Sequence, residues 1–593
     1  MVRYLLLAGA PPSSLVDAVT KRLAKLGDEF VAVASSSRIA LFTDTPSAVV
    51  EIASGGFLLG TMFAPDGARI TRLSEAQQAC VGIGGAAVLP ELVWGSYLAV
   101  CVDVTGGDID VMRDPSGALP CYFTSGPKIT AFSSDADLLV QLGLASAAID
   151  WTGIDAHLRR VGLRAAQTCL ADVKELLASQ VFRLGRSNEK PACVWSPWSF
   201  AGRERQFTRY EDAVVAVGQT VRSAVRALAR ETRRSVLGVS GGLDSSIVAA
   251  CLSECEVDVT LATMVTQDPR GDERAYASVI ATAIGRDLHA CFESLDLVDL
   301  TISKAAHLPR PTARAFAQST NALFQELADA RHADAFFSGG GGDNVFCLMH
   351  NVLPVVDRYR VEGLSRGLAK TAIDVSMVAG VSVWEVFRRS LRRQMSSRHG
   401  YVWPETSSYL APGAAGLGAV AHHPWLDAPP GTLPGKAAHI AWVMHVQNHI
   451  EGHGEARTLP TLWPLLSQPV IETCLRVPTW MWFQGGRNRS VARAAFTDIL
   501  PQQIVTRRSK GTPDGFAAKI FETRRAQIRD MLSEGMLATH GMLDMNSIHV
   551  ALGHERLHDT PEFNRIMTIV DVEAWLRAWS GRSQASADIK SLL

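Results

Sequence analysis

Cysteine is scarce in this chain and follows no pattern. The ten cysteines among its 593 residues form no Cys-x-x-Cys pair and no regular framework. This excludes a disulfide scaffold, and in a chain of this length it predicts reduced, cytoplasmic thiols. Cys251 and Cys255 lie one helical turn apart, but no histidine or further cysteine nearby completes a metal set, so we expect them to pack in a core.

Long apolar runs are absent as well. No stretch approaches the roughly 18 uninterrupted apolar residues that cross a bilayer. The apolar run near the start is short, and Pro11-Pro12 follow it at once, which favours a first strand over a signal sequence. We therefore expect a soluble, cytoplasmic protein with no membrane partner.

An excess of charge of either sign is also lacking. The 58 Lys and Arg residues oppose 59 Asp and Glu residues, so the formal net charge is -1. A nucleic acid is not expected as the main partner, because binding a polyanion requires a concentrated basic surface. One basic run, Arg388–Arg393, is either a local binding patch or the solvated face of a helix.

The length of the chain predicts at least two domains, and two regions of the sequence differ in their pattern of strands and helices. Residues 1–205 contain short strands separated by Gly, Pro and Asp, among them Tyr97–Val104 and Ile109–Met112. Residues 206–593 open with a helical stretch at Glu211–Arg230, after which strands and helices alternate. That alternation predicts a parallel sheet with helices on both faces.

Residues 399–436 form a long segment rich in Gly, Pro and Ala. A loop of this length is usually functional or mobile, so the segment is a candidate lid. Beyond it the pattern is helical to the end of the chain, closing with Val570–Trp579, and internal repeats are lacking.

The most informative segment is Ser240–Ser246, with the sequence Ser-Gly-Gly-Leu-Asp-Ser-Ser. An apolar strand leads into this turn and an apolar helix follows it. Glycines let the backbone turn sharply and approach a ligand, and the N–H groups at a helix start attract an anion. The serine hydroxyls add donors for phosphate oxygens, whereas Asp244 makes sense as a metal ligand. The Gly-Lys-Ser/Thr ending of a Walker A loop is missing.

A second glycine-rich segment supports the same kind of site. The strand predicted at Asp334–Ser338 runs into four consecutive glycines and then Asp343. At the carboxyl end of a strand such glycines let the backbone approach a ligand, at the edge where open α/β sheets bind. Asp343 is then predicted to share a Mg²⁺ ion with Asp244 across the phosphates of a nucleotide.

These two loops resemble the synthetase domain of class B asparagine synthetases and their relatives, the β-lactam synthetases and lasso-peptide cyclases. Thr263–Val265 resembles the strand end that holds adenine in these relatives. Asp272–Ala277 resembles the acidic opening of their next helix. Leu500–Gly511 resembles the segment with the catalytic lysine, which nominates Lys510 for stabilising charge on pyrophosphate or on a tetrahedral intermediate. The resemblance implies ATP and Mg²⁺ as cofactors and a C-terminal domain of the adenine-nucleotide α-hydrolase type.

The N-terminal residues resemble the glutaminase-like domain of the same family, which implies an Ntn-type β-sandwich. Glutamine-using members expose an N-terminal cysteine nucleophile, whereas this chain begins Met1-Val2. We therefore expect no glutaminase activity, and an amine that comes from the substrate or from free ammonia. The segments that carry the resemblance are Trp94–Tyr97, Arg113–Gly117, Pro120–Tyr122 and Phe132–Asp135.

The resemblance also implies a set of site residues. The implied catalytic residues are Lys510, Asp244 and Asp343, and the two aspartates are the implied metal ligands. The implied nucleotide contacts are Val239, Ser240, Gly241, Gly242, Asp244, Ser245, Ser246, Met264, Ser338, Gly339 and Gly340.

Two departures from asparagine synthetases bear on the substrate. Their second loop usually has Ser-Gly-Glu-Gly-Ser/Ala-Asp-Glu, where this chain has Ser-Gly-Gly-Gly-Gly-Asp-Asn over Ser338–Asn344. Trp463–Pro469 stands in place of an Arg-x-Pro-Phe-Leu-Asp type sequence. Both variants look most like lasso-peptide cyclases.

That resemblance implies adenylation of an Asp or Glu side chain in a precursor core peptide, followed by attack of the N-terminal amine of the peptide to close a macrolactam. It also implies a leader peptidase and a leader-binding protein as partners, with residues 399–436 as a lid or peptide-binding wall. A β-lactam-type ring closure and an ammonia-dependent asparagine synthetase use the same chemistry and stay open. An inactive nucleotide-binding scaffold is a further alternative, although it is disfavoured because Asp244, Asp343 and Lys510 are all present.

Three histidines, His445, His449 and His453, recur every four residues and suggest zinc. Gly452 and Gly454 break the helix near its end, and no carboxylate–histidine signature accompanies them. A polar helix end is therefore favoured over a metal site.

Overall fold

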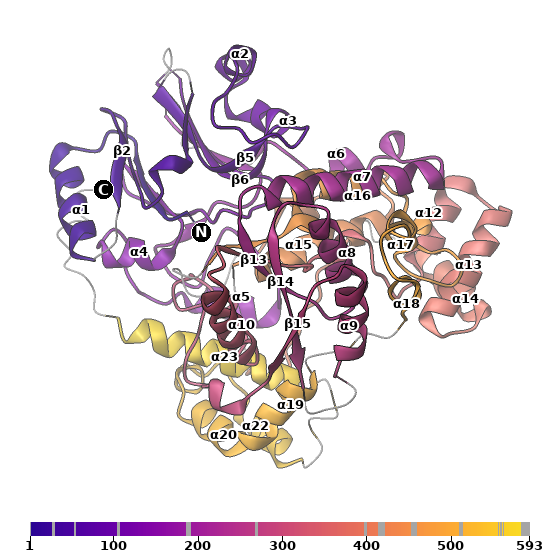
Figure 1. Ribbon diagram of the computed structural model, residues 1–593. Helices are drawn as coiled ribbons and strands as arrows, with labels where there is room; N and C mark the ends of the chain where they lie inside the picture. The colour runs from indigo at the N-terminus through magenta and orange to yellow at the C-terminus, as the bar shows by residue number, and fades with distance from the viewer. Residues whose placement is uncertain are drawn as a thin grey trace.

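The computed structural model of the chain (Figure 1) has a β-rich N-terminal domain, indigo to purple, and an α/β C-terminal domain packed against it. The structure describes residues 2–26, 30–52, 55–103, 107–185, 191–266, 271–395, 400–412, 421–451, 459–508, 511, 514–554, 557, 560 and 562–582.

Two antiparallel sheets make up the N-terminal domain, each with six strands among the described residues. One has the order β10-β8-β9-β1-β3-β2 and the other β12-β11-β7-β6-β5-β4. The strands are β1 (Tyr4–Ala8), β2 (Val31–Ser35), β3 (Ile39–Thr43), β4 (Val49–Ile52), β5 (Gly56–Phe63), β6 (Trp94–Val102), β7 (Ile109–Arg113), β8 (Tyr122–Ser125), β9 (Thr130–Ser133), β10 (Lys174–Glu175), β11 (Gln180–Leu184) and β12 (Ala192–Cys193).

The two-residue period of the strands builds the core of this sandwich. Leu6 of β1 packs between the sheets with Phe57 of β5, whereas its neighbours Leu5 and Leu7 join a separate core with helices. The β-sandwich expected from the sequence is therefore confirmed. The helices of this domain are α1 (Ser13–Lys25), α2 (Glu75–Gly84), α3 (Leu89–Leu92), α4 (Ala136–Gln141), α5 (Trp151–Arg159) and α6 (Trp198–Ala201).

A parallel sheet with the order β15-β14-β13-β16-β17 organises the C-terminal domain. Leu237 of β13 packs with α7 and α8, and its neighbour Val236 packs against α10, so helices cover both faces as the sequence predicts. The elements are β13 (Arg234–Gly238), β14 (Asp258–Val265), β15 (Leu288–Phe292), β16 (Ala335–Phe337), β17 (Thr461–Leu462), α7 (Tyr210–Ala229), α8 (Leu243–Ser253), α9 (Arg274–Ala283) and α10 (Ala317–Arg331).

Two groups of the remaining helices extend the α/β domain at its ends, whereas α11, α15 and α16 share the core with α7 and α8 (Figure 1). Helices α12 to α14 lie at one edge, and α19 to α23 share a core with α1 and α4 of the N-terminal domain. Their bounds are α11 (Gly342–Val345), α12 (Leu353–Glu362), α13 (Arg366–Ala379), α14 (Val383–Met395), α15 (Pro434–Ile450), α16 (Gln468–Leu475), α17 (Ser490–Ala495), α18 (Gln502–Thr506), α19 (Asp514–Thr523), α20 (Arg525–Ser533), α21 (Met536–Thr539), α22 (Met545–Gly553) and α23 (Glu562–Ser580).

The Pro/Gly-rich segment is shorter than expected, because α15 already begins at Pro434. The first of its two described parts, residues 400–412, packs on the N-terminal domain. Trp403 donates from Nε1 to the Val161 carbonyl at 3.2 Å, and the Thr406 N–H donates to the Arg159 carbonyl at 2.9 Å. No helix within the described ranges is long and apolar enough to cross a bilayer.

A buried cluster of charges joins the two domains. Glu175 of β10 accepts from Arg113 at 2.5 Å and from Arg164, and it pairs with Arg310 of the C-terminal domain. Glu451, which follows α15, accepts in turn from Arg113 at 2.8 Å and from Arg164 at 2.6 Å. All five side chains are buried, so each carboxylate exchanges water for guanidinium donors.

The protonation of Glu175 depends on these neighbours. Burial alone would raise the pKa of its carboxyl, but Arg164, Arg310 and Arg113 together hold that pKa well below the ordinary value of 4.5. A carboxylate whose pKa is lowered by folding stabilises the fold above its unfolded pKa. That stabilisation is lost as the pH falls below about 4.5 and toward the lowered folded pKa.

We predict that Glu175→Gln lowers the free energy of unfolding by about 3–5 kcal/mol, because it leaves three buried guanidinium groups with one carboxylate fewer. The loss in thermal melts should be largest at neutral pH and shrink below about pH 4.5, where Glu175 of the unfolded wild-type chain is progressively protonated while the folded protein keeps the carboxylate charged. Asp110→Asn, which removes the exposed pair with Arg183, is the control and should cost less than about 1 kcal/mol. Equal melting of the two variants at neutral pH would contradict the role of the cluster.

Candidate nucleotide-binding site

The first glycine-rich loop joins β13 to α8 at the carboxyl edge of the parallel sheet. Ser240 accepts from the Gly242 N–H with its hydroxyl at 3.2 Å, which fixes the turn. Gly241 has a φ of +62°, and a Cβ there would lie 2.4 Å from backbone and side-chain atoms of Tyr276. A glycine is therefore required, and the turn leaves the N–H groups at the start of α8 directed outward.

The second glycine-rich loop packs directly on the first. A Cβ on Gly339 would lie 2.5 Å from the Ser245 nitrogen, and one on Gly342 would lie 2.3 Å from the carboxyl carbon of Asp244. Only hydrogen fits at both contacts. The run of glycines thus brings β16 against the first loop and sets Asp343 beside Asp244.

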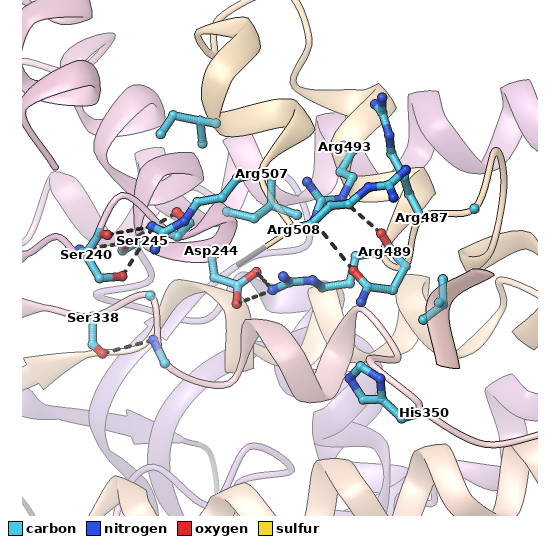
Figure 2. Close-up of a pocket in the computed structure, with 18 of the residues that line it drawn as sticks. Ser240, Asp244, Ser245, Ser338, His350, Arg487, Arg489, Arg493, Arg507 and Arg508 are labelled. Atoms are coloured by element: carbon cyan, nitrogen blue, oxygen red, sulfur yellow. Dashed lines mark hydrogen bonds and ion pairs between the residues drawn. The ribbon is translucent and has the colours of Figure 1, made fainter. Parts of the chain in front are cut away.

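A cavity of about 350 Å³ opens where the two loops meet (Figure 2). Its polar walls come from both loops and from the segments that flank α17 and α18. Its charged and hydroxyl side chains are those of Ser240, Asp244, Ser245, Ser338, His350, Arg487, Arg489, Arg493, Arg507 and Arg508.

Arg489 stands between the two aspartates. One of its terminal nitrogens lies 3.1 and 3.0 Å from the carboxylate oxygens of Asp244 and also contacts Asp343. Its backbone has a φ of +51°, which is uncommon for a residue with a side chain and is concentrated at functional positions. The Nε of Arg489 is buried and has no hydrogen-bond partner among the described residues. The guanidinium therefore keeps donor capacity for a ligand.

Three of the other arginines form no ion pair with a carboxylate among the described residues, namely Arg487, Arg493 and Arg508, whereas Arg507 pairs with Glu273. Arg493 donates to the backbone carbonyls of Asn488 at 2.9 Å and Val505 at 2.6 Å and to the side-chain oxygen of Asn488 at 3.5 Å, all of which are uncharged. Desolvation, followed by repulsion from Arg489 and other arginines, lowers the pKa of Arg493 to about 10. Such an excess of positive charge around the cavity favours a polyanion such as pyrophosphate.

The two aspartates meet the requirements of a Mg²⁺ ion. Their carboxylates converge on a single point, because both contact the same nitrogen of Arg489. Mg²⁺ commonly uses one or two carboxylates together with phosphate oxygens. Asp244 and Asp343 therefore fit the metal that the sequence predicts, with the remaining ligands left to a nucleotide and water.

Lys510 lies outside the described residues, so its assignment stays a prediction. Both flanks of its segment are anchored to one residue, Glu273. Arg507 donates to this carboxylate at 2.5 Å and also to the Ser240 carbonyl at 2.9 Å, and the Gly511 N–H donates to it at 3.0 Å. The segment is thereby held at the edge of the first loop.

A second cavity of about 280 Å³ adjoins the first at Ser240. Val239, Thr263 and Met264, at the ends of β13 and β14, line it together with Phe324 of α10. A pocket with both apolar and polar walls beside an anion loop suits the base and ribose of a nucleotide.

The structure places most of the predicted nucleotide contacts around these two cavities, and two of them line neither cavity. Gly241 supports the turn without lining either cavity, and Ser246 is fully buried in α8. The arginines of the 487–493 segment were missed, because lone arginines in a sequence are usually solvated; Gly485-Gly486 before them, both with a φ of +64°, was the available signal. Among the described residues no three His, Cys, Asp or Glu side chains are close enough to form a metal site of their own, and His453 lies outside that range.

A parallel sheet with an anion loop, two convergent aspartates and an arginine cluster at its carboxyl edge defines a nucleotide-binding α/β domain. The family model for asparagine synthase matches residues 216–577, more than half of the chain. The protein therefore belongs to the asparagine synthase family, whose members are ATP-dependent enzymes that form amide bonds, typically with Mg²⁺. No curated protein sequence matches this chain.

Among solved structures, the chain is similar to the glutamine phosphoribosylpyrophosphate (PRPP) amidotransferase from B. subtilis complexed with ADP and GMP. The identity is 9% over 49% of this chain and 81% of that chain, with a TM-score of 0.21. A structure of the allosteric regulatory enzyme of purine biosynthesis matches at 9% identity over 49% and 80% of the two chains, also with a TM-score of 0.21. At these TM-scores neither likeness supports a conclusion about this protein.

We predict that Arg489→Met weakens binding of inorganic pyrophosphate, measured by calorimetry with Mg²⁺ present, by about 10- to 100-fold. The reason is that hydrogen bonds to charged groups contribute about 1.5–3 kcal/mol each. Arg222→Met, which removes the partly exposed pair between Arg222 of α7 and Asp498, is the matched control and should change the affinity by less than about twofold. Unchanged affinity in Arg489→Met would show that this guanidinium does not bind pyrophosphate.

Proposed function

We propose that the protein is a lasso-peptide cyclase. It uses ATP to activate an Asp or Glu side chain of a precursor core peptide and joins that side chain to the N-terminal amine of the peptide as a macrolactam. Membership of the asparagine synthase family supports the ATP-dependent formation of an amide bond. The finer assignment to a cyclase rests on the two departures from asparagine synthetases.

The observation that carries the proposal is that these two departures touch each other. A Cβ on Gly340 would lie 2.3 Å from the Trp463 ring, so the indole covers the position from which the glutamate of asparagine synthetases projects. Gly340 and Trp463 are therefore one coupled change, in which an apolar wall replaces an acidic side chain beside the first cavity. Such a wall suits a peptide better than it suits free aspartate with its two additional charged groups.

An interdomain cavity of about 470 Å³ supplies room for the peptide. It shares Gly238 and Ser338 with the nucleotide cavity, and Trp463 forms part of its wall. Thr320 and Asn321 of α10 line it, and neither side chain has a hydrogen-bond partner among the described residues. Hydrogen-bonding groups left open in this way suit the amide groups of a peptide chain.

The amine has no evident source in glutamine. Val2 lines a further cavity of about 330 Å³, which shares Pro460, Thr461 and Trp463 with the interdomain cavity, and none of its lining residues is a cysteine. A valine side chain cannot attack an amide. We therefore propose that the nucleophile is the amine of the substrate itself. A leader peptidase and a leader-binding protein remain predicted partners on the resemblance alone.

The chemistry that we propose has two steps. A carboxylate oxygen of the peptide attacks the α-phosphorus of ATP, and the bond to the bridging oxygen breaks, which gives acyl-AMP and pyrophosphate. The peptide amine then attacks the acyl carbon, AMP leaves, and the amine gives up a proton. Asp244 and Asp343 would hold a Mg²⁺ ion, which neutralises phosphate charge when bound.

The protein contributes position and charge to these steps. The N–H groups at the start of α8 hold the phosphates, and Arg489 and Arg493 stabilise the leaving pyrophosphate. The interdomain cavity holds the amine near the acyl-AMP and keeps water away from it.

We predict that, with ATP and Mg²⁺, the protein converts the precursor peptide encoded beside its gene into a protease-resistant product that has lost one water, with AMP formed. Mass spectrometry with aspartate plus ammonium offered in parallel distinguishes the alternatives. Asparagine formed with the peptide untouched would identify an ammonia-dependent synthetase and refute the cyclase assignment.

We predict that Asp244→Asn lowers AMP release, measured with the substrate that the enzyme turns over, by about 100-fold or more. The reason is that the variant loses one of the two carboxylates proposed to hold Mg²⁺ at the phosphates. Asp498→Asn, at the exposed end of its pair with Arg222, is the control and should retain nearly full activity. Unchanged AMP release in Asp244→Asn would show that this carboxylate has no role in the reaction.

A further inference from the structure

Helices α12, α13 and α14 expose an unusual amount of apolar surface. Of the seventeen exposed large apolar side chains among the described residues, eight lie on these helices or on the link between α12 and α13. Concentrated exposure of this kind marks an interaction surface, whereas single exposed apolar residues are ordinary. The eight are Tyr359, Val361, Leu364, Ile373, Met377, Trp384, Leu391 and Met395.

One face of α14 combines apolar and basic groups. Trp384, Arg388, Leu391, Arg392 and Met395 follow at helical intervals of four, seven, eight and eleven residues, so they share one side of the helix. Trp384 is 83% exposed and Met395 is 78% exposed. The opposite side of the same helix is buried at Val386 and Ser390, so the helix is already packed and its outer face is a surface.

The charge of this face is positive. Arg388 and Arg389 both pair with a single carboxylate, that of Glu385, each at 2.6 Å. Arg392 has no hydrogen bond or ion pair with any residue in the described ranges. The exposed side of α13 adds Lys370 next to Ile373. A partner that complements this surface must therefore bring acidic groups.

The surface borders the nucleotide cavity. Met377 of α13 lines that cavity, and its side chain packs against Gly486, where a Cβ would lie 2.5 Å from the Met377 methyl carbon. Asp374, also on α13, accepts from the Gly486 N–H at 2.8 Å. Gly486 precedes Arg487 and Arg489, so α13 supports the loop that presents these arginines. Figure 1 shows α13 and α14 at the edge of the molecule near α17 and α18.

We propose that the outer surface of α12–α14 is a docking site for an acidic polypeptide segment that carries apolar anchors. Trp384, Leu391 and Met395 receive the anchors, and Arg388 and Arg392 pair with the carboxylates of the segment. A polypeptide fits better than a membrane, because the exposed apolar groups are spread over three packed helices and interspersed with charges, not gathered on one continuous helix face. This site goes beyond the proposed function and does not depend on the nature of the reaction.

The test uses the full chain and two fluorescein-labelled polymers, poly(Glu,Tyr) and poly(Glu), with binding followed by anisotropy. Saturating inorganic pyrophosphate and Mg²⁺ occupy the arginine cavity, so that polyanion binding there does not contribute. We predict that poly(Glu,Tyr) binds more tightly than poly(Glu). Binding of poly(Glu,Tyr) should fall about tenfold or more in Trp384→Ser and in the double variant Arg388→Glu/Arg392→Glu.

The double variant Arg203→Glu/Arg209→Glu makes the same change of charge at two exposed arginines far from α14 in sequence, and its affinity should stay within about twofold of wild type. Unchanged pyrophosphate binding in every variant shows that each is folded, and it tests the nucleotide site separately from the surface. Equal losses in both double variants, or no binding of poly(Glu,Tyr), would overturn the proposal. Binding to phosphatidylglycerol vesicles that is lost in Trp384→Ser, with no binding of poly(Glu,Tyr), would overturn it in favour of a membrane.

Discussion

The contact between Arg113, Arg164 and Arg310 and the carboxylates of Glu175 and Glu451 fixes how the two domains meet. All five charged side chains are buried, and burial of so many charges is stable only when every carboxylate oxygen accepts from a guanidinium or another donor. Glu451 lines the interdomain cavity, so the same contact that closes the interface also shapes the space beside the nucleotide site. A shift of one domain against the other would break several buried ion pairs at once.

The contact between the two loops of the nucleotide site depends on close approaches that only glycine permits. Because Gly339 packs on Ser245 and Gly342 on Asp244, the second loop can lie against the first and the two aspartates can converge. Gly340 in turn makes room for Trp463, which comes from the segment after β17 and faces the interdomain cavity. The wall of the interdomain cavity and the contact between the two glycine-rich loops are therefore built from successive residues of one loop, so a change at one of them affects the geometry of the other.

Both domains and the two glycine-rich loops could be predicted from the sequence, because strand periodicity and glycine patterns are local signals. β17 could not, since two residues carry no periodicity and its pairing with β16 joins segments more than a hundred residues apart. The arginine cluster escaped for a similar reason. The role of Arg489 depends on its contacts with Asp244 and Asp343, which lie far away in the chain. The sequence alone does not show that these three residues meet. The end of the Pro/Gly-rich segment was misjudged because Pro434 starts α15, a position that proline favours.

The aspartates and the arginines of the site balance one another only in part. Arg489 pairs with both Asp244 and Asp343 and so offsets the repulsion between the two carboxylates. A Mg²⁺ ion held by the same carboxylates would supply positive charge in place of the guanidinium, and Arg489 would then be available to phosphate oxygens. Arg493 has no carboxylate partner among the described residues, and desolvation followed by repulsion from Arg489 lowers its pKa. The arginine cluster therefore favours a ligand that brings several anionic oxygens, as a triphosphate does.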